Sequence, residues 1–115
     1  MDSCVFCKIV KKEIPASPLY ESDQVLAFAD LHPMAPVHLL IIPKTHYSNL
    51  NEIPDEELKV IEEMYRAARQ LAAEKGIQDR GYRLAMNVNS EGGQSVFHVH
   101  LHLLGGRQLG PSLVG

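Results

Sequence analysis

The stretch that decides the fold runs Gly92-Gly93-Gln94-Ser95-Val96-Phe97-His98-Val99-His100-Leu101-His102-Leu103-Leu104-Gly105-Gly106. Histidines and apolar residues alternate in its second half, and a period of two predicts a strand from His98 to Leu104. Successive side chains of a strand point to opposite faces. We therefore expect the apolar side chains to lie in a core, and His98, His100 and His102 to share the other face.

The spacing of the three histidines limits what they can do together. At about 3.3 Å per residue, neighbours lie roughly 6–7 Å apart along the strand and the outer pair about 13 Å apart. Two neighbours can share a metal ion, whereas three on one ion would be strained. The spacing favours divided roles, in which one imidazole attacks, one donates to an anion, and one orients or binds metal. The alternative is a half-buried strand that carries its histidines on a solvated face.

The residues ahead of the histidines favour an anion-binding role. Glycines allow backbone N–H groups to approach a ligand closely, and Gln94 and Ser95 add side-chain donors. A donor-rich turn beside histidines suits a phosphate group. We therefore expect Gly93, Gln94 and Ser95 to lie against a phosphate.

The segment His98–Leu104 has the signature His-φ-His-φ-His-φ-φ, in which φ is an apolar residue. With it the chain resembles the histidine triad (HIT) superfamily, and further short motifs are similar to those of its Hint branch. These motifs are Glu13-Ile14-Pro15, Ala35-Pro36-Val37-His38, Ile42-Pro43-Lys44, Gly81-Tyr82-Arg83 and Gly105-Gly106-Arg107. The resemblance extends from about Cys4 to Gly110.

The resemblance implies a hydrolase of purine nucleoside 5′-phosphoramidates, of the adenosine 5′-monophosphoramidase type. It assigns the attack to His100, which would carry a nucleotidyl-histidine intermediate. It puts His102 beside the phosphate and His98 on the far side in a supporting role. His38 would join a proton relay, and Ser95 would donate to the phosphate or the leaving group.

The resemblance also implies the residues that bind the nucleotide. They are Asp30, Leu31, Asn87, Gly93, Gln94, Ser95, His100 and His102. Asp30 follows a predicted strand, and its carboxylate suits two ribose hydroxyls. Ile9 and Phe28 are candidates for an apolar wall beside the nucleotide.

Composition indicates one globular domain spanning residues 1–115, with an irregular tail over about 107–115. Apolar residues make up 45% and charged residues 22%, as in ordinary soluble proteins. A net charge of −3 without a basic cluster gives no indication of a nucleic-acid partner. The first residues show neither a signal peptide nor a membrane span, so we expect a cytoplasmic protein without membrane contact.

The order of the predicted elements indicates an α+β fold with a five-stranded antiparallel sheet, one long helix and a short N-terminal helix, which matches the HIT-like fold that the resemblance implies. Helices are predicted at 4–12 and 54–75, and strands at 19–21, 25–29, 38–42, 82–87 and 98–104. Seven positions of the long helix have helical spacing and are expected to face the sheet: Leu58, Ile61, Met64, Tyr65, Ala68, Leu71 and Ala72. The resemblance adds a homodimer whose two sheets join.

Cys4 and Cys7 form a C-x-x-C pair, which in a reducing compartment favours metal over a disulfide. A structural zinc needs four nitrogen or sulfur ligands. HIT relatives that keep both cysteines imply His46 and His98 as the other two. We expect a structural zinc at these four residues and no metal requirement for catalysis. The alternative is a pair of small buried thiols in the first helix.

Other functions stay open at the level of sequence. The substrate could be a dinucleoside polyphosphate. A nucleotidyl transferase is disfavoured, because His102 stands where transferases of the superfamily carry glutamine. A nucleotide-binding, zinc-stabilised interaction module is the alternative from another class. Such a module has no need of a nucleophile, so the combination of His38, Ser95 and the triad favours the enzyme.

Overall fold

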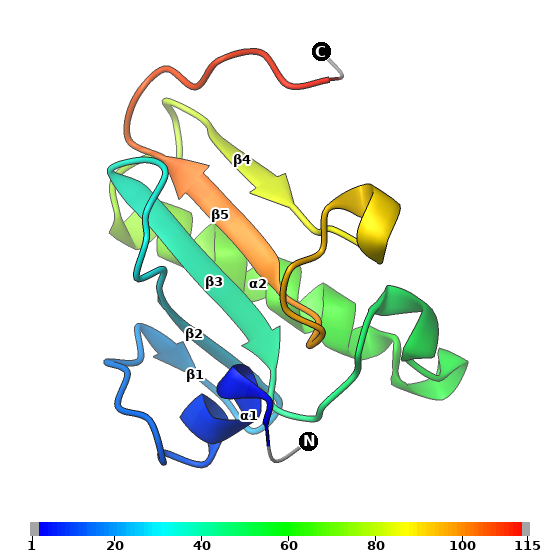
Figure 1. The fold of residues 1–115 in the computed structure, drawn as a ribbon. Coiled ribbons are helices and arrows are strands. Elements are labelled where there is room, and N and C mark those ends of the chain that lie inside the picture. The colour runs from blue at the N-terminus through cyan, green and yellow to red at the C-terminus, as the bar shows by residue number, and fades with distance from the viewer. Residues whose placement is uncertain (1–2, 114–115) are drawn as a thin grey trace.

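The computed structural model describes residues 3–113. Within them the strands β1 (Tyr20–Glu21), β2 (Val25–Ala29), β3 (Val37–Pro43), β4 (Tyr82–Ala85) and β5 (Leu101–Gly105) form one sheet. All pairs are antiparallel and the order is β1-β2-β3-β5-β4. The helices are α1 (Val5–Val10) and α2 (Lys59–Glu74), and short 3₁₀ turns are η1 (Leu50–Glu52), η2 (Asp55–Glu57) and η3 (Ser90–Gly92). The predicted α+β fold class is confirmed (Figure 1).

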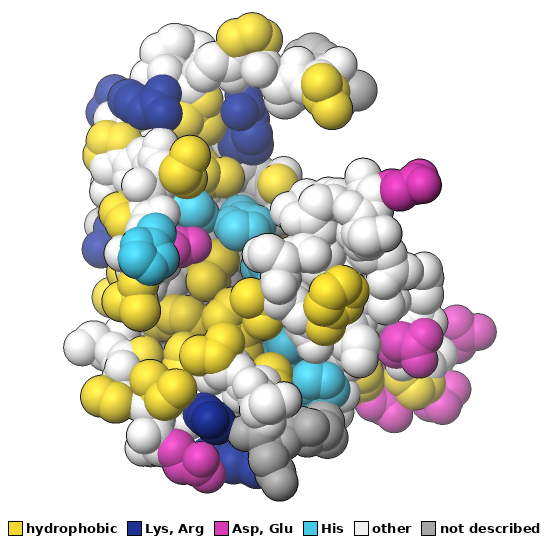
Figure 2. Space-filling model, in the orientation of Figure 1, with side chains coloured by type: hydrophobic (Ala, Val, Ile, Leu, Met, Phe, Trp, Pro, Cys, Tyr) yellow, Lys and Arg dark blue, Asp and Glu magenta, His cyan; other side chains and the backbone are white. Residues whose placement is uncertain are grey.

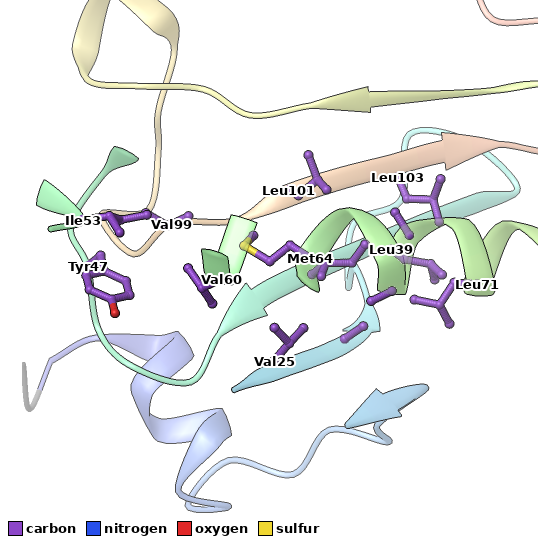
Figure 3. Packing of buried hydrophobic residues seen from close by; sticks show 14 residues of the cluster. Val25, Leu39, Tyr47, Ile53, Val60, Met64, Leu71, Val99, Leu101 and Leu103 are labelled. Atoms are coloured by element: carbon purple, nitrogen blue, oxygen red, sulfur yellow. The ribbon is translucent and has the colours of Figure 1, made fainter. Parts of the chain in front are cut away.

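Helix α2 covers one face of the sheet and closes the main core. The helix buries Val60, Met64, Ala67, Ala68, Leu71 and Ala72. Met64 and Leu71 lie over Leu39 and Leu103 of the central strands (Figure 3). The prediction that Leu58 and Tyr65 face the sheet is wrong, because they are 40% and 46% exposed. At 3.6 residues per turn, both lie about 100–120° around the helix axis from Met64, at the border of the packed face.

The long helix begins later than predicted. Pro54 is followed by the 3₁₀ turn η2, in which Glu57 donates to the Pro54 carbonyl at 2.9 Å and Leu58 to that of Asp55 at 3.3 Å. Regular α-helix starts only at Lys59. Tight turns of this kind are common at helix N-termini, and the sequence pattern of acidic residues does not distinguish them from α-helix.

The triad strand is shorter than predicted and begins at Leu101. The reason is that β3 pairs with β5 only as far as Ile41↔Leu101. Before that point the N–H of Val99 donates instead to the carbonyl of Tyr47, at 2.8 Å. The alternation still holds, since Val99, Leu101 and Leu103 are all in the core.

The histidine side of this segment is not solvated. His98 is 0% and His100 4% exposed, so the alternative of a histidine-bearing solvated face is wrong. Phe6 of α1 covers them, with ring centroids 5.8 Å from His98 and 5.3 Å from His100. A second apolar cluster around Phe6, Phe28 and Ile42 fills this side of the sheet.

The remaining predicted elements exist with shifted ends. The first helix ends at Val10, β3 extends by a residue at each end, and β4 stops at Ala85. Residues 107–113 form no helix or strand. None of the helices within residues 3–113 combines the length and the apolar character needed to cross a membrane.

Candidate active site

Four histidines gather on the face of the sheet that α2 leaves open. His38 lies in β3 opposite Leu104, and His102 lies in β5, so the two are diagonal neighbours on the same face. His98 and His100 lie in the segment that leads into β5. Figure 2 shows histidine side chains in the middle of this face, bordered by an apolar area. The predicted constellation of His38 and the triad is therefore brought together in space.

One hydrogen bond determines which nitrogen of His100 is free. Its Nδ1 lies 2.8 Å from the carbonyl oxygen of His98. A carbonyl only accepts, so Nδ1 carries the hydrogen and donates. In the neutral ring the lone pair is then on Nε2. The ring is held by Phe6 and by His102, whose centroid is 5.0 Å away. The neutral form of His100 therefore presents a fixed Nε2 that carries the lone pair.

A chain of hydrogen bonds assigns the protons of the other two histidines. The N–H of Met34 donates to Nδ1 of His38 at 3.0 Å. The hydrogen of a neutral His38 is therefore on Nε2, and it points to Nδ1 of His102 at 2.9 Å. His102 accepts at Nδ1 and so carries its hydrogen on Nε2. We call this chain (Met34 N–H, His38, His102) the histidine relay.

Burial keeps two of the rings neutral. It lowers the pKa of His102 to about 4, and the neighbouring His100 and His38 add to the effect. Burial likewise lowers the pKa of His98 to about 4. At pH 7 each ring thus has one donor and one acceptor nitrogen.

Asp30 lies beside the relay, at the end of β2. Its Oδ1 accepts the N–H of His32 at 2.8 Å, and its Oδ2 lies 3.4 Å from Nε2 of His38. Oxygen and nitrogen atoms of Asp30, His38 and His102 lie within 4.8 Å of one another, close enough to hold a metal ion. However, Nδ1 of His38 already accepts a hydrogen bond, so a metal on Nε2 would require the ring to lose its remaining proton. The hydrogen bonds favour a relay over a metal site here.

A second cluster has the geometry of a metal site. Cys4, Cys7, His46 and His98 each offer an atom within 4.8 Å of the others. Sγ of Cys7 lies 3.2 Å from Nδ1 of His46 and 3.7 Å from Nδ1 of His98, and Sγ of Cys4 lies 3.4 Å from the latter. Metal–ligand bonds of about 2.0 and 2.3 Å in a tetrahedron give sulfur–nitrogen separations of about 3.5 Å. These four residues, which the sequence predicted as ligands, could hold a metal ion.

The surroundings of this cluster support a metal. Nε2–H of His98 donates to the carbonyl of Pro43 at 2.8 Å, which leaves Nδ1 unprotonated toward the sulfurs. Burial, a hydrogen bond that the Cys7 thiol donates to Cys4, and the charge of Cys4 raise the pKa of the Cys7 thiol. Burial also lowers the pKa of His46. Without a cation, two neighbouring thiolates repel each other. A bound cation would stabilise both of them.

The predicted phosphate loop follows η3. Gly93 has φ +83°, a left-handed conformation that favours glycine. The Gln94 side chain is buried and bonded within the protein, to the N–H of Asn89 at 2.8 Å and the carbonyl of Ser48 at 2.7 Å. It shapes the loop, whereas Ser95 is exposed. The N–H groups of Gly93 and Gln94 donate to the carbonyls of Ser90 and Asn89, both at 3.0 Å. Of the predicted phosphate contacts, the exposed Ser95 is therefore the one that offers a side-chain donor to a phosphate here.

A mostly apolar cavity of about 420 Å³ lies next to Phe28, whose ring contacts Phe6, the residue that covers His98 and His100. It is lined by Ile9, Val10, Lys12, Ile14, Pro15, Ala16, Ser17, Pro18, Glu21, Leu26 and Phe28. Ile9 and Phe28 were the two walls expected from sequence. The others were not predicted: some lie in the irregular segment 12–18, and Val10, Glu21 and Leu26 lie in α1, β1 and β2, where nothing in their spacing marks a cavity. Of the other predicted nucleotide contacts, Leu31 is 86% exposed and Asn87 is half-buried beyond the end of β4.

Comparison with known proteins identifies the family of this chain. A family model described as HIT domain matches residues 11–109. The chain is 45% identical over 112 residues to purine nucleoside phosphoramidase of Escherichia coli (strain K12), covering 97% of this chain and 94% of that protein. A HIT family hydrolase from Clostridium thermocellum matches with TM-score 0.94 and 45% identity over 99% of both chains. One from Legionella pneumophila matches with TM-score 0.88 and 50% identity, over 92% of this chain and 95% of that one.

Proposed function

The chain belongs to the HIT domain family, and from this premise we propose that it hydrolyses purine nucleoside phosphoramidates through a nucleotide bound covalently to His100. The hydrolase class rests on the likeness to the phosphoramidase and to the HIT family hydrolases. The covalent route rests on one observation: the bond from Nδ1 of His100 to the His98 carbonyl leaves Nε2 as a buried, oriented nucleophile.

The first step forms one bond and breaks another. Nε2 of His100 attacks the phosphorus, the P–N bond of the substrate breaks, and the amine leaves with a proton that solvent supplies through the Ser95 hydroxyl and that the second step returns to solvent. The positive charge that develops on His100 is stabilised by the His98 carbonyl at 2.8 Å. The relay holds Nε2–H of His102 as a preorganised donor to a phosphate oxygen, which gains charge in the transition state.

The second step regenerates the enzyme. Water attacks the phosphorus of the nucleotidyl-His100, the P–Nε2 bond breaks, and the nucleoside monophosphate leaves after the water has given up a proton to solvent. Two easier displacements replace one difficult one. The loop at Gly93 and Ser95 holds the phosphate throughout.

Recognition of the nucleoside is assigned to the cavity and to Asp30. An apolar space of about 420 Å³ suits the flat face of a purine. Asp30 is half-buried at the end of β2 and can accept the ribose hydroxyls. Leu31 and Asn87 complete the proposed set. A dinucleoside polyphosphate would use the same pocket, and relative rates on the two substrate classes separate these candidates.

We assign a structural zinc to Cys4, Cys7, His46 and His98. Support comes from the sulfur–nitrogen separations of 3.2–3.7 Å and from the carbonyl that fixes the His98 tautomer. Zinc would tie α1 to the sheet and supply no chemistry to the reaction. A reduced cysteine pair agrees with a cytoplasmic location.

We also propose a homodimer formed through β4. This strand has β5 as its neighbour and lies at the end of the strand order, so its other edge can pair. All its residues are half-buried. Closed two-fold pairing is the commonest assembly of soluble proteins.

The decisive experiment is rapid quenching of the enzyme with an adenosine phosphoramidate, followed by mass spectrometry of its peptides. We expect one adenylyl group on His100, and none in His100→Asn. Turnover without an adduct would contradict the covalent route, and an adduct on another histidine would reassign the nucleophile. Tight nucleotide binding without turnover would favour the binding module.

A further inference from the structure

We propose that Arg107 is a positioning residue for the histidine relay, acting through the backbone of Met34. Its Nη2 donates to the Met34 carbonyl at 3.0 Å, and the N–H of the same residue donates to His38 Nδ1 at 3.0 Å. The two bonds hold Met34 from both sides. This inference rests on the relay assigned under the proposed function.

The relay depends on where the Met34 N–H points. If that donor moved away, Nδ1 of His38 could carry the hydrogen instead, and Nε2 would no longer donate to His102 at 2.9 Å. His102 would then lose the bond that keeps its hydrogen on Nε2. A backbone group in the loop 32–36 therefore selects the tautomers of two active-site rings.

The loop 32–36 is also tied to the end of β2 by the N–H of His32, which donates to Asp30 at 2.8 Å. Its side chains are largely exposed, with Met34 at 71% and only Ala35 buried. Two prolines, Pro33 and Pro36, have no N–H to donate. The bond from Arg107, 73 residues along the chain, is thus a long-range restraint on the loop.

The chain is built to bring Arg107 to Met34. Gly106 has φ +92°, and a Cβ there would meet Pro36 Cβ at 3.0 Å and Val37 N at 3.3 Å. Only a glycine lets the two segments pass this closely without displacement. Nη1 of Arg107 donates to the Gln108 carbonyl at 3.0 Å, and no carboxylate of the described residues forms an ion pair with Arg107. Both bonds fix backbone.

The test compares Arg107→Met with Arg107→Lys and with the control Arg66→Met, a surface arginine on α2 bonded to Glu62. Loss of positioning should lower kcat about 10- to 100-fold, with little change in KM. Lysine keeps one charged donor and should recover part of the rate. Long-range ¹H–¹⁵N spectra should show His38 with its hydrogen on Nε2 in the wild type, and a mixture of tautomers in Arg107→Met.

A double-mutant cycle with His38→Gln separates this inference from the relay itself. If both residues act through one chain of bonds, Arg107→Met should cost little more in the His38→Gln background. Full activity of His38→Gln would contradict the relay. Two outcomes would overturn the role of Arg107 and leave the relay standing. In one, kcat falls in His38→Gln but not in Arg107→Met. In the other, the double variant loses kcat by the product of the two single losses. Unchanged His38 tautomers in a slow, folded Arg107→Met would also overturn it.

Discussion

Nδ1 of His100 donates to the carbonyl oxygen of His98 at 2.8 Å, so the ring of one triad member is anchored to the backbone of another. His98 in turn is fixed by its own ring, which donates to Pro43 at 2.8 Å and faces two cysteines. The proposed nucleophile is therefore positioned by the residue that also belongs to the metal cluster. The predictions below separate these two roles.

Replacing His100 by Asn should abolish hydrolysis and leave nucleotide binding largely intact. Asn can still donate to the His98 carbonyl but has no imidazole lone pair, and loss of a covalent nucleophile costs roughly 10³-fold or more in kcat. The fold should persist, because Val99, Leu101 and Leu103 hold the segment from the other side. Steady-state kinetics and calorimetric titration with adenosine monophosphate measure the two effects. Turnover near the wild-type rate in a folded variant would be incompatible with the assignment.

Asp30→Ala should raise the KM for nucleoside substrates about 10-fold, as expected for loss of hydrogen bonds to a charged acceptor. A 2′,3′-dideoxy substrate should show a similar loss with the wild type and little further loss with the variant. Multiplying losses would show that Asp30 does not contact the ribose. Because this comparison combines a change in the protein with a change in the substrate, it also controls for any effect of Asp30→Ala that acts through His38, whose Nε2 lies 3.4 Å from Oδ2 of Asp30.

Protein purified without chelator should contain about one zinc per chain by elemental analysis. Chelation should lower the melting temperature by about 10 °C or more, because structural zinc contributes several kcal/mol and each kcal/mol is worth about 4–8 °C in a domain of this size. Catalysis should fall less, since no ligand is the nucleophile. In the double variant Cys4→Ser/Cys7→Ser, chelator should not change the melting temperature. Activity that vanished reversibly with zinc at unchanged fold would make the metal catalytic.

The protein should run as a dimer of about 26 kDa, twice the 12.8 kDa chain. Light scattering coupled to size exclusion at micromolar concentration measures this mass. A species of one chain's mass under these conditions would rule out the assembly through β4.

Metal-free protein should lose stability as the pH falls from about 6.5 to 4. His98 and His102 have pKa values of about 4 when folded, against about 6.5 when unfolded. Between these values the unfolded chain binds more protons, so the free energy of unfolding decreases with decreasing pH. For His98, which is 0% exposed, the loss is at most on the order of 3 kcal/mol. Urea unfolding between pH 7 and 4.5 gives the slope, and His102→Gln should make it shallower; a flat wild-type profile would contradict the prediction.

The periodicity of apolar residues predicted most of the fold, because β5 and α2 each bury one side, and such burial produces alternating spacing in a strand and helical spacing in a helix. It placed Val99, Leu101 and Leu103 correctly. It failed where tertiary contacts override the local pattern: Val99 bonds to Tyr47 instead of β3, and Phe6 buries histidines that an isolated strand would expose.

The candidate site was predictable where side-chain chemistry is distinctive. The cluster of Cys4, Cys7, His46 and His98 gathers as expected. What could not be read from the sequence are the backbone partners, the carbonyls of His98 and Pro43 and the N–H of Met34, because every residue type offers the same groups. Those partners determine the tautomers and hence the chemistry.

The apolar cavity beside the site is lined entirely by residues between Ile9 and Phe28. The histidines and the phosphate loop all come from later in the chain, from His38 to His102. One short contiguous segment thus forms the cavity, and a separate one carries the reaction. Since the proposal places the base in this cavity, a single exchange within residues 9–28 would change which base is accepted without replacing a proposed catalytic group, and chains of this fold could then differ in ligand while keeping one chemistry.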